Sequence, residues 1–288
     1  MRKPVTRKTP VKRKPSVKKK PAFWKGRGSL VLTVFCVLLL VGTIYHYREG
    51  LAYYLGFKSH KVAAHSGEED KRFSDVRNFQ LLSKYEDKVA GLDVSQYQGE
   101  INWEQVHTLE NTFPIGFVFI RATAGTDKVD LQFEKNWVGT KNNKIIRGAY
   151  HYYRPNENSL EQATLFIQNV HLQKGDLPPV LDIEKLPKNQ SIDSLKVGLK
   201  RWLEKIDAHY NVRPIIYTSS TYYDDFLKEE FSDYTFWIAN YNFFVEDIKV
   251  DWLFWQFTEK STVSGIKGNV DVTIYNGTPK MLGYLTIN

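Results

Sequence analysis

The sequence predicts an α/β barrel that follows a basic tail and an uncharged apolar segment. Two observations predict the barrel. From about Val89 onward, short β-branched and aromatic runs alternate with amphipathic stretches of helical period, which indicates parallel βαβ units. No Gly-rich phosphate-binding loop follows any of these runs, so a nucleotide-binding doubly wound sheet is disfavoured and a barrel is favoured.

The basic charge of the chain belongs to its first 28 residues. This tail holds 12 Lys and Arg and no acid; removing them from the 40 cations of the whole chain leaves 28 cations against 32 acids. The remainder is therefore mildly acidic. A basic tail can bind nucleic acid, but the segment that follows explains it better, and no nucleic-acid partner is expected.

Residues 29–45, SLVLTVFCVLLLVGTIY, carry no charge. They are slightly fewer than the roughly 20 residues that span a bilayer. Because no small-residue cleavage site follows, we expect an uncleaved signal anchor, a single N-terminal transmembrane helix. Cations stay on the cytoplasmic side, so the tail 1–28 is expected in the cytoplasm and the rest outside the cytoplasmic membrane. A buried core helix is the alternative, disfavoured by the flanking cations.

The only cysteine, Cys36, lies in this apolar segment. The part that follows it therefore has no disulfide, no thiol nucleophile and no Cys-ligated metal site. Residues 46–88 are charged and mixed, and we expect a stalk that is partly helical near 73–85. Residues 89–288 are expected to form the main folded domain.

Strands and helices are predicted in order along that domain. The strand candidates are 89–95, 116–122, 145–153, 178–184, 213–219, 236–241 and 253–258. Helical patterns lie between them at 159–173 and 191–210. In the second helix, apolar residues recur at helical spacing: Leu195, Leu199, Trp202, Leu203 and Ile206.

Acids gather near the ends of three segments, where barrel enzymes carry their working residues. Asp93 lies in GLDVS, Asp182 and Glu184 in VLDIE, and Asp271 in GNVDVTIYNG. Side chains alternate along a strand, so Asp182 and Glu184 share one face while Ile183 takes the other. Neighbouring carboxylates raise each other's pKa, which keeps one protonated as a general acid requires.

Aromatic residues accompany these acids: Tyr97, Tyr150, Tyr152, Tyr217, Trp237, Tyr241 and Trp255. Rings that rim carboxylates suit a carbohydrate, whose C–H faces stack on rings while its hydroxyls bond to the acids. The competing interpretation is structural, since strand-end Asp often caps a turn and strand aromatics often fill a core. His151 is more typical of a wall residue, and the seven His show no ligand spacing, so neither a metal nor a cofactor is expected.

Seven blocks, in order, resemble the family 25 glycoside hydrolases. GLDVSQYQGEINWEQV is similar to the first strand and its following pattern, FVFIRATAGTDKVDLQFEKNW to the second strand and its loop, and RGAYHYYRP to the third strand. PPVLDIE looks like the strand with the Asp-x-Glu pair. PIIYTS, FWIANY and FWQFTEKSTVSGIKGNVDVTIYNG match the remaining blocks. The resemblance covers about residues 89–280.

This resemblance implies a flattened, irregular barrel that cleaves the β-1,4 bond between N-acetylmuramic acid and N-acetylglucosamine in peptidoglycan glycan strands. It implies that Glu184 donates the proton, Asp182 assists the reacting sugar, and Asp93 and Asp271 complete the acidic floor. One block departs from the family, which commonly has Glu where Ala124 stands here. A peptidoglycan-binding module that has lost catalysis is therefore one alternative. A chitinase-like hydrolase that uses the same Asp-x-Glu pair is another.

Overall fold

The computed structural model describes residues 23–46, 66–242, 244–248 and 252–288. The chain divides into two compact units, Met1–Ala52 and Tyr53–Asn288. In the first, α1 (Phe23–His46) is one continuous helix that includes residues 29–45. Within the described part of the chain, no helix is long and apolar enough to cross a membrane, so the span expected at 29–45 is not confirmed and stays a prediction. Most of the basic tail lies outside the described residues.

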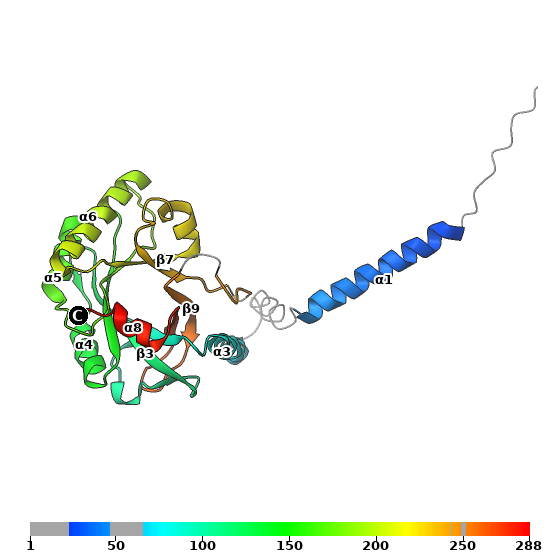
Figure 1. The fold of residues 1–288 in the computed structure, drawn as a ribbon, viewed down its shortest axis with the longest axis horizontal. Coiled ribbons are helices and arrows are strands. Elements are labelled where there is room, and N and C mark those ends of the chain that lie inside the picture. Colours follow the sequence, from blue (N-terminus) through cyan, green and yellow to red (C-terminus); the bar gives the residue numbers. More distant parts are fainter. Residues whose placement is uncertain (1–22, 47–65, 243, 249–251) are drawn as a thin grey trace, which may run out of the picture. The chain divides into compact units, whose positions relative to one another are not determined.

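A closed ring of strands forms the centre of the second unit (Figure 1). The ring closes because β1 pairs with β3 on one side and with β10 on the other. In the described residues its eight strands, in ring order, are β1 (Val89–Val94), β3 (Phe113–Ala124), β5 (Ile146–Tyr152), β6 (Val180–Asp182), β7 (Ile215–Ser219), β8 (Thr235–Ala239), β9 (Phe254–Ser261) and β10 (Val270–Tyr275).

All neighbouring strands run parallel except β10, which is antiparallel to both β9 and β1. The loop at 262–269 between β9 and β10 explains this, since a parallel connection needs a crossover of a dozen or more residues. The expectation of uniformly parallel units is therefore wrong for the last strand. Strand β10 was also absent from the strand candidates, and β6 ends at Asp182, two residues earlier than predicted.

Three helices cover the outside of the parallel strands: α4 (Phe133–Asn142), α5 (Ser159–Asn169) and α6 (Ile192–Tyr210). The apolar stripe predicted in α6 is confirmed, because all five of its residues are buried. Ser191 caps the start of α6, and Asn211 ends it in the left-handed conformation. Short elements complete the domain: η1 (Gln96–Gln98), η2 (Trp103–Gln105), β2 (Thr108–Leu109), β4 (Lys128–Val129), α7 (Ser220–Tyr222) and η3 (Tyr223–Leu227).

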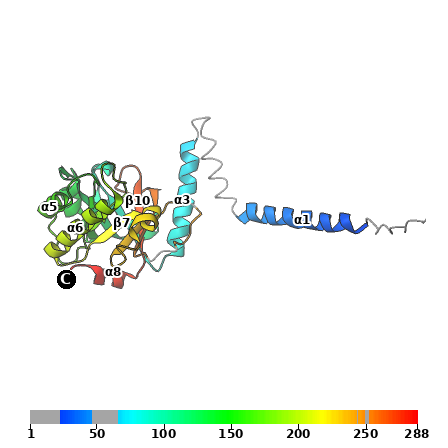
Figure 2. The same cartoon turned by 90° about the horizontal axis from the view of Figure 1, so that it is seen from above.

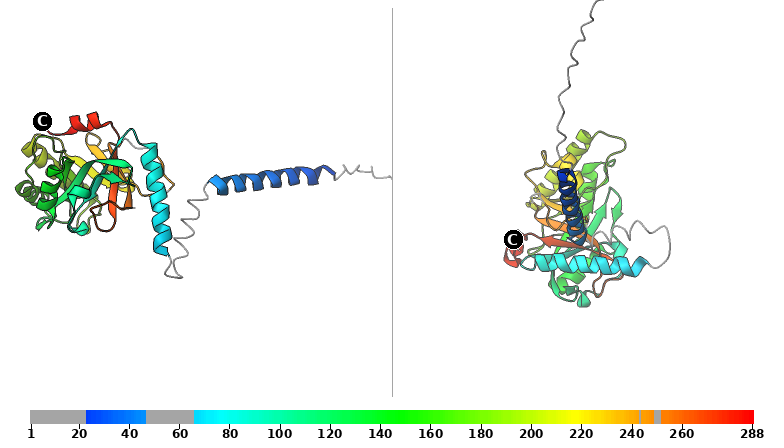
Figure 3. Two further views of the ribbon diagram at one scale, coloured as in Figure 1. Left: turned by 90° about the horizontal axis from the view of Figure 1, so that it is seen from below. Right: turned by 90° about the vertical axis from the view of Figure 1, so that its right-hand side faces the viewer.

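Helix α3 (Ser66–Lys84) lies beside β9 (Figure 3). Leu81 and Leu82 are buried in the main core, and the Tyr85 ring meets the edge of Trp255 at 6.0 Å between centroids. The helix predicted near 73–85 is confirmed, but it does not belong to a free stalk. The packed domain begins before Val89, because β9 has no long helix of its own to cover it and α3 does so instead.

Inward-facing side chains fill one end of the barrel. Phe119 stacks on Trp237 at 4.5 Å between ring centroids and contacts Phe254 edge-on at 5.2 Å. Helix α8 (Pro279–Leu285) lies across that end and adds Leu282 to the same cluster (Figure 2). A barrel packed and covered in this way has no channel through it, so a ligand can enter only from the opposite end.

Candidate active site

A pocket of about 290 Å³ opens at the carboxyl ends of the parallel strands. The four predicted acids all line it: Asp93, Asp182, Glu184 and Asp271. Six of the seven predicted aromatic residues line it as well: Tyr97, Tyr150, Tyr152, Tyr217, Trp237 and Tyr241. The structure thus brings together nearly every residue that the sequence analysis selected.

Asp93 and Asp271 lie directly opposite each other in the β1–β10 pair. Asp93 is the penultimate residue of β1, whereas Asp271 is the second residue of β10. The two meet because β10 runs antiparallel to β1. Burial raises the pKa of Asp93 well above its usual value, and the charge of Asp271 raises it further. Burial also raises the pKa of Asp271 to about 6. The pair therefore holds a shared proton in the neutral range and titrates as a unit.

Gln256 fixes the orientation of this pair. Its Nε2 donates to Asp93 Oδ2 at 2.5 Å, while its Oε1 accepts hydrogen bonds from the hydroxyls of Tyr217 (2.6 Å) and Tyr241. The amide of Gln256 can only donate to Asp93, so it holds this carboxyl in place between Gln256 and Asp271. The sequence analysis missed Gln256, although strand alternation on β9 could have identified it.

That same alternation corrects the assignment of Trp255 to the substrate. Phe254 and Gln256 point into the barrel, so Trp255 between them points outward. Its ring is fully buried beside Tyr85, and its Nε1 donates to the backbone oxygen of Asn240 at 3.2 Å. Trp255 anchors α3 to the barrel and does not line the pocket.

Asp182 and Glu184 are presented by a backbone locked to β7. The Ile183 amide donates to the backbone carbonyl oxygen of Tyr217 at 3.0 Å. Thr218 Oγ1 donates to the backbone carbonyl oxygen of Ile183 at 2.7 Å. Ile183 is buried in the outer core, so the acids on either side of it both face the pocket, as the alternation predicted.

The two acids differ in their surroundings. Asp182 is only 6% exposed, and its Oδ1 has no hydrogen-bond partner among the described residues. Burial and then the charge of Glu184 raise the pKa of Asp182 well above its usual value, while Arg121 lowers it. Glu184 stands exposed at the mouth, yet enough protein surrounds its carboxyl to raise the pKa, against the opposing effect of Lys185. A raised pKa keeps a carboxyl protonated and able to act as an acid.

Arg121 is the cation of the pocket, and a β-bulge places it there. Arg121 is opposite Tyr150 in the β3–β5 pair, and the register then shifts so that Thr123 lies opposite His151. Thr123 and His151 are buried outside the barrel, joined at 2.7 Å between Oγ1 and Nδ1. Burial lowers the pKa of His151 to about 4, so its ring stays neutral, as expected of a wall residue.

The pocket can support acid–base chemistry on an uncharged polar substrate. It combines a protonatable carboxyl at the mouth, a buried carboxyl with an unpaired oxygen, and a proton-sharing pair on the floor. Burial raises the pKa of Tyr150 and of Tyr217 well above the usual value, so both phenols remain hydrogen-bond donors. Within the described residues, no group of three or more His, Cys, Asp or Glu is placed to hold a metal ion.

Comparisons with known proteins agree with this geometry. The sequence profile described as "Glycosyl hydrolases family 25" matches residues 92–266. Lysozyme M1 of Streptomyces globisporus is 33% identical over 215 residues, covering 69% of this chain and 72% of that protein. A protein of Escherichia coli K12 named YegX is 35% identical over 212 residues, covering 73% and 78%. The crystal structure of a bacterial lysozyme from Streptomyces coelicolor superposes with a TM-score of 0.63 at 30% identity, covering 69% of this chain and 97% of that one.

Proposed function

Because the chain belongs to family 25 of the glycosyl hydrolases, we propose that it is a muramidase, which hydrolyses the β-1,4 bond between N-acetylmuramic acid and N-acetylglucosamine in peptidoglycan. The observation that carries the proposal is the pairing of a buried Asp182 with an exposed Glu184 in one acidic pocket. The names of relatives support the substrate, since both a Streptomyces globisporus and a Streptomyces coelicolor relative are called lysozymes.

In the proposed reaction, Glu184 donates its proton to the glycosidic oxygen as the bond to the anomeric carbon breaks. Its place at the open mouth lets it reach a leaving sugar and, afterwards, a water molecule. Once the 2-acetamido oxygen of the substrate has replaced the leaving sugar at the anomeric carbon, the Glu184 carboxylate takes a proton from that water. The water oxygen attacks the anomeric carbon and breaks its bond to the acetamido oxygen.

Asp182 has the complementary role of orienting the reacting sugar. Its unpaired Oδ1 is an acceptor for the N–H of the 2-acetamido group, and this group's oxygen attacks the anomeric carbon in a substrate-assisted step. Asp182 precedes Glu184 by only two positions and both side chains line the same pocket, which leaves little room for Asp182 to attack from the opposite side of the sugar. Asp93 and Asp271 hold their shared proton beneath this site.

The binding-module alternative rested on Ala124. In the structure Ala124 does not line the acidic pocket; it lines a neighbouring one. The residue that departs from the family pattern is thus outside the proposed catalytic group, which favours an active enzyme.

Digestion of purified peptidoglycan by the full chain tests the proposal and its alternatives. New reducing ends on muramic acid are expected from a muramidase. Reducing ends on glucosamine would indicate a hydrolase of different specificity, such as the chitinase-like alternative. Glycan binding without any new reducing end would identify a binding module and contradict the proposed reaction.

We also propose that residues 29–45 anchor the enzyme in the cytoplasmic membrane, with the catalytic domain on its outer side. The support is the uncharged run itself, its inclusion in helix α1, and the 12 cations that precede it. An anchored muramidase cannot diffuse to foreign cells, so remodelling of the cell's own wall is its proposed role.

A further inference from the structure

A second pocket, of about 720 Å³, adjoins the acidic pocket. The two share three lining residues, Tyr97, Arg121 and Tyr152. The shared wall is held in place by Arg121, whose guanidinium lies 4.7 Å below the Tyr97 ring and whose Nε donates to Asp130 at 2.8 Å. A ligand in the acidic pocket can therefore extend into the second pocket past a rigid boundary.

The charge of the second pocket is opposite to that of the first. Four cations line it: Arg121, Lys128, Arg154 and Lys185. Asp130 is the only acid among its described lining residues, and both of its oxygens are occupied. Oδ2 accepts from Arg121 and from the Gln96 amide at 2.9 Å, and Oδ1 accepts from the Gln132 amide at 3.0 Å. Asp130 therefore neutralises Arg121 and leaves three further cations in the lining, Lys128, Arg154 and Lys185.

The hairpin of β3 and β4 supplies one wall of this pocket. Ala124 lies opposite Lys128 in the pairing, and both line the pocket. A Glu at position 124 would add an acid to the wall that carries Lys128. The short Ala124 side chain adds no such charge and occupies less space.

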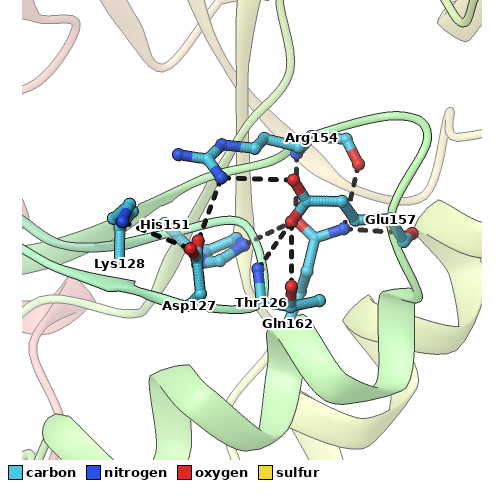
Figure 4. Close-up of polar contacts among 7 residues, drawn as sticks. All are labelled: Thr126, Asp127, Lys128, His151, Arg154, Glu157 and Gln162. Atoms are coloured by element: carbon cyan, nitrogen blue, oxygen red, sulfur yellow. Dashed lines mark hydrogen bonds and ion pairs between the residues drawn. The ribbon is translucent and has the colours of Figure 1, made fainter.

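A network behind the hairpin keeps it fixed (Figure 4). Glu157 Oε2 accepts hydrogen bonds from the amide of Thr126 at 2.7 Å and from its Oγ1 at 3.2 Å. Arg154 Nη1 joins Glu157 (3.2 Å) to Asp127 (3.1 Å) across the loop. Arg154 is therefore occupied in holding the loop.

The amine of Lys128 is held less firmly than Arg154. Among the residues that the structure describes, its one ion pair is with Asp127, at 3.3 Å, and its side chain is 65% exposed. Such exposed ion pairs contribute little and exchange readily. Lys128 can thus turn toward a stronger anionic partner in the pocket.

We propose that this cationic pocket binds carboxylates of the stem peptide attached to the muramic acid residues of the glycan. The inference rests on the proposed function. The sugar rings in the acidic pocket are uncharged, so they offer nothing for these cations to bind. The peptide that branches from the lactyl group of muramic acid carries free carboxylates, and it leaves the glycan beside the reacting bond. Its charge complements Lys128 and Lys185.

The test compares two substrates with full-length variants of the chain. One substrate is peptidoglycan with intact stem peptides, and the other is the same glycan after an amidase has removed them. Lys128→Glu reverses one charge in the pocket. Lys200→Glu is the matched control, because Lys200 is also an exposed cation with an acidic partner, Glu230 at 2.7 Å, but belongs to α6 and lines neither pocket. The readout is kcat/KM from new reducing ends.

The ratio of kcat/KM on intact over stripped glycan is expected to fall about five- to tenfold in Lys128→Glu. The ratio should stay within about twofold of the wild-type value in Lys200→Glu. It should also stay near the wild-type value in Lys128→Arg, because Arg keeps the positive charge. An unchanged ratio in Lys128→Glu, or an equal change in Lys200→Glu, would overturn the inference about the cationic pocket. Cleavage of the glycan by the wild type would still support the proposed muramidase activity in that case. A wild type that cleaves neither substrate would overturn both.

Discussion

At the scale of single residues, Asp182 and Glu184 divide one reaction between a buried and an exposed carboxyl. Glu184→Gln removes the transferable proton and should lower kcat by about 10² to 10⁴ fold. Asp182→Asn keeps the shape and an acceptor oxygen but cannot carry the negative charge that stabilises the acetamido group, so it should be severely impaired while glycan binding persists. Turnover on purified peptidoglycan and a glycan pull-down measure these effects. Near-normal turnover by Glu184→Gln would refute its role as proton donor.

The pH dependence of the enzyme follows from the neighbours of Glu184. A general acid works while it is protonated, so activity should fall as pH rises through the pKa of Glu184, which burial has raised. Lys185 opposes that rise. Lys185→Ala should therefore shift the alkaline limb of the kcat/KM profile to higher pH.

Lys188→Ala is the control for this shift. Lys188 is an exposed lysine in the same loop that is not among the groups acting on the pKa of Glu184. Its removal should leave the alkaline limb in place. A shift to lower pH in Lys185→Ala would contradict the assignment of Glu184 as the acid.

Most site residues could be predicted because they lie on a strand, or just beyond its end, where the alternation is visible in the sequence. The alternation around Ile183 correctly placed Asp182 and Glu184 on one face. Trp255 was assigned by residue type and not by its strand face, so the prediction selected it in place of Gln256. Arg121 and Ala124 face the same side although they are three residues apart, because of a bulge that no sequence pattern announces.

At the scale of elements, the β3–β4 turn depends on Gly125. Its φ is +58°, and a Cβ there would lie 2.3 Å from Glu157 Oε2. Gly125→Ala should strain the backbone and displace Glu157 from its hydrogen bonds. The backbone strain alone should lower the free energy of unfolding by about 1 to 3 kcal/mol. Gly268→Ala is the matched control, with φ +79° but no atom within 4 Å of the added Cβ. Thermal unfolding should show the larger loss for Gly125→Ala; equal losses would mean that the network adds nothing.

Elements with long, regular patterns were predictable, and those defined by tertiary contacts were not. The stripe of α6 identified that helix directly. The direction of β10 depends on which strands it joins, and its pairing with β1 closes the ring across almost the whole domain. The membership of α3 in the domain likewise depends on distant partners on β9.

At the scale of the whole molecule, the acidic pocket should reduce stability as pH rises. The pKa of Asp271 is about 6 in the folded chain against 3.8 as its usual value, so the folded state binds more protons between these values. The free energy of unfolding should then fall as pH rises through this window.

Asp271→Asn is neutral at every pH and should remove that part of the dependence. It should also lessen the part due to Asp93, whose pKa the charge of Asp271 raises, so both changes act in the same direction. His151, with its pKa lowered to about 4, acts in the opposite sense in both proteins and cancels in the comparison. Urea unfolding at pH 4 and pH 7 measures the difference between the wild type and Asp271→Asn. A difference that does not change between these pH values would contradict the raised pKa.

The proposed topology is also a property of the whole chain. A reporter active only in exported compartments, fused after Asn288, should be active, whereas one that functions only in the cytoplasm should be silent. Replacing the cations of the tail with Ser should reduce the export-dependent signal, because the positive-inside preference would be lost. Cytoplasmic reporter activity with the wild-type tail would overturn the orientation.

Helix α8, which closes the far end of the barrel, determines how this enzyme can be attached to a solid support. Backbone hydrogen bonds join Ile287 to Gly175 and Asp176 at 2.9 Å each, which fixes the last residues at the covered end of the barrel. A linker after Asn288 therefore leaves the chain on the side away from the acidic pocket. On beads coupled through the C-terminus, the acidic pocket should face away from the bead surface. It should then remain accessible to insoluble fragments of cell wall.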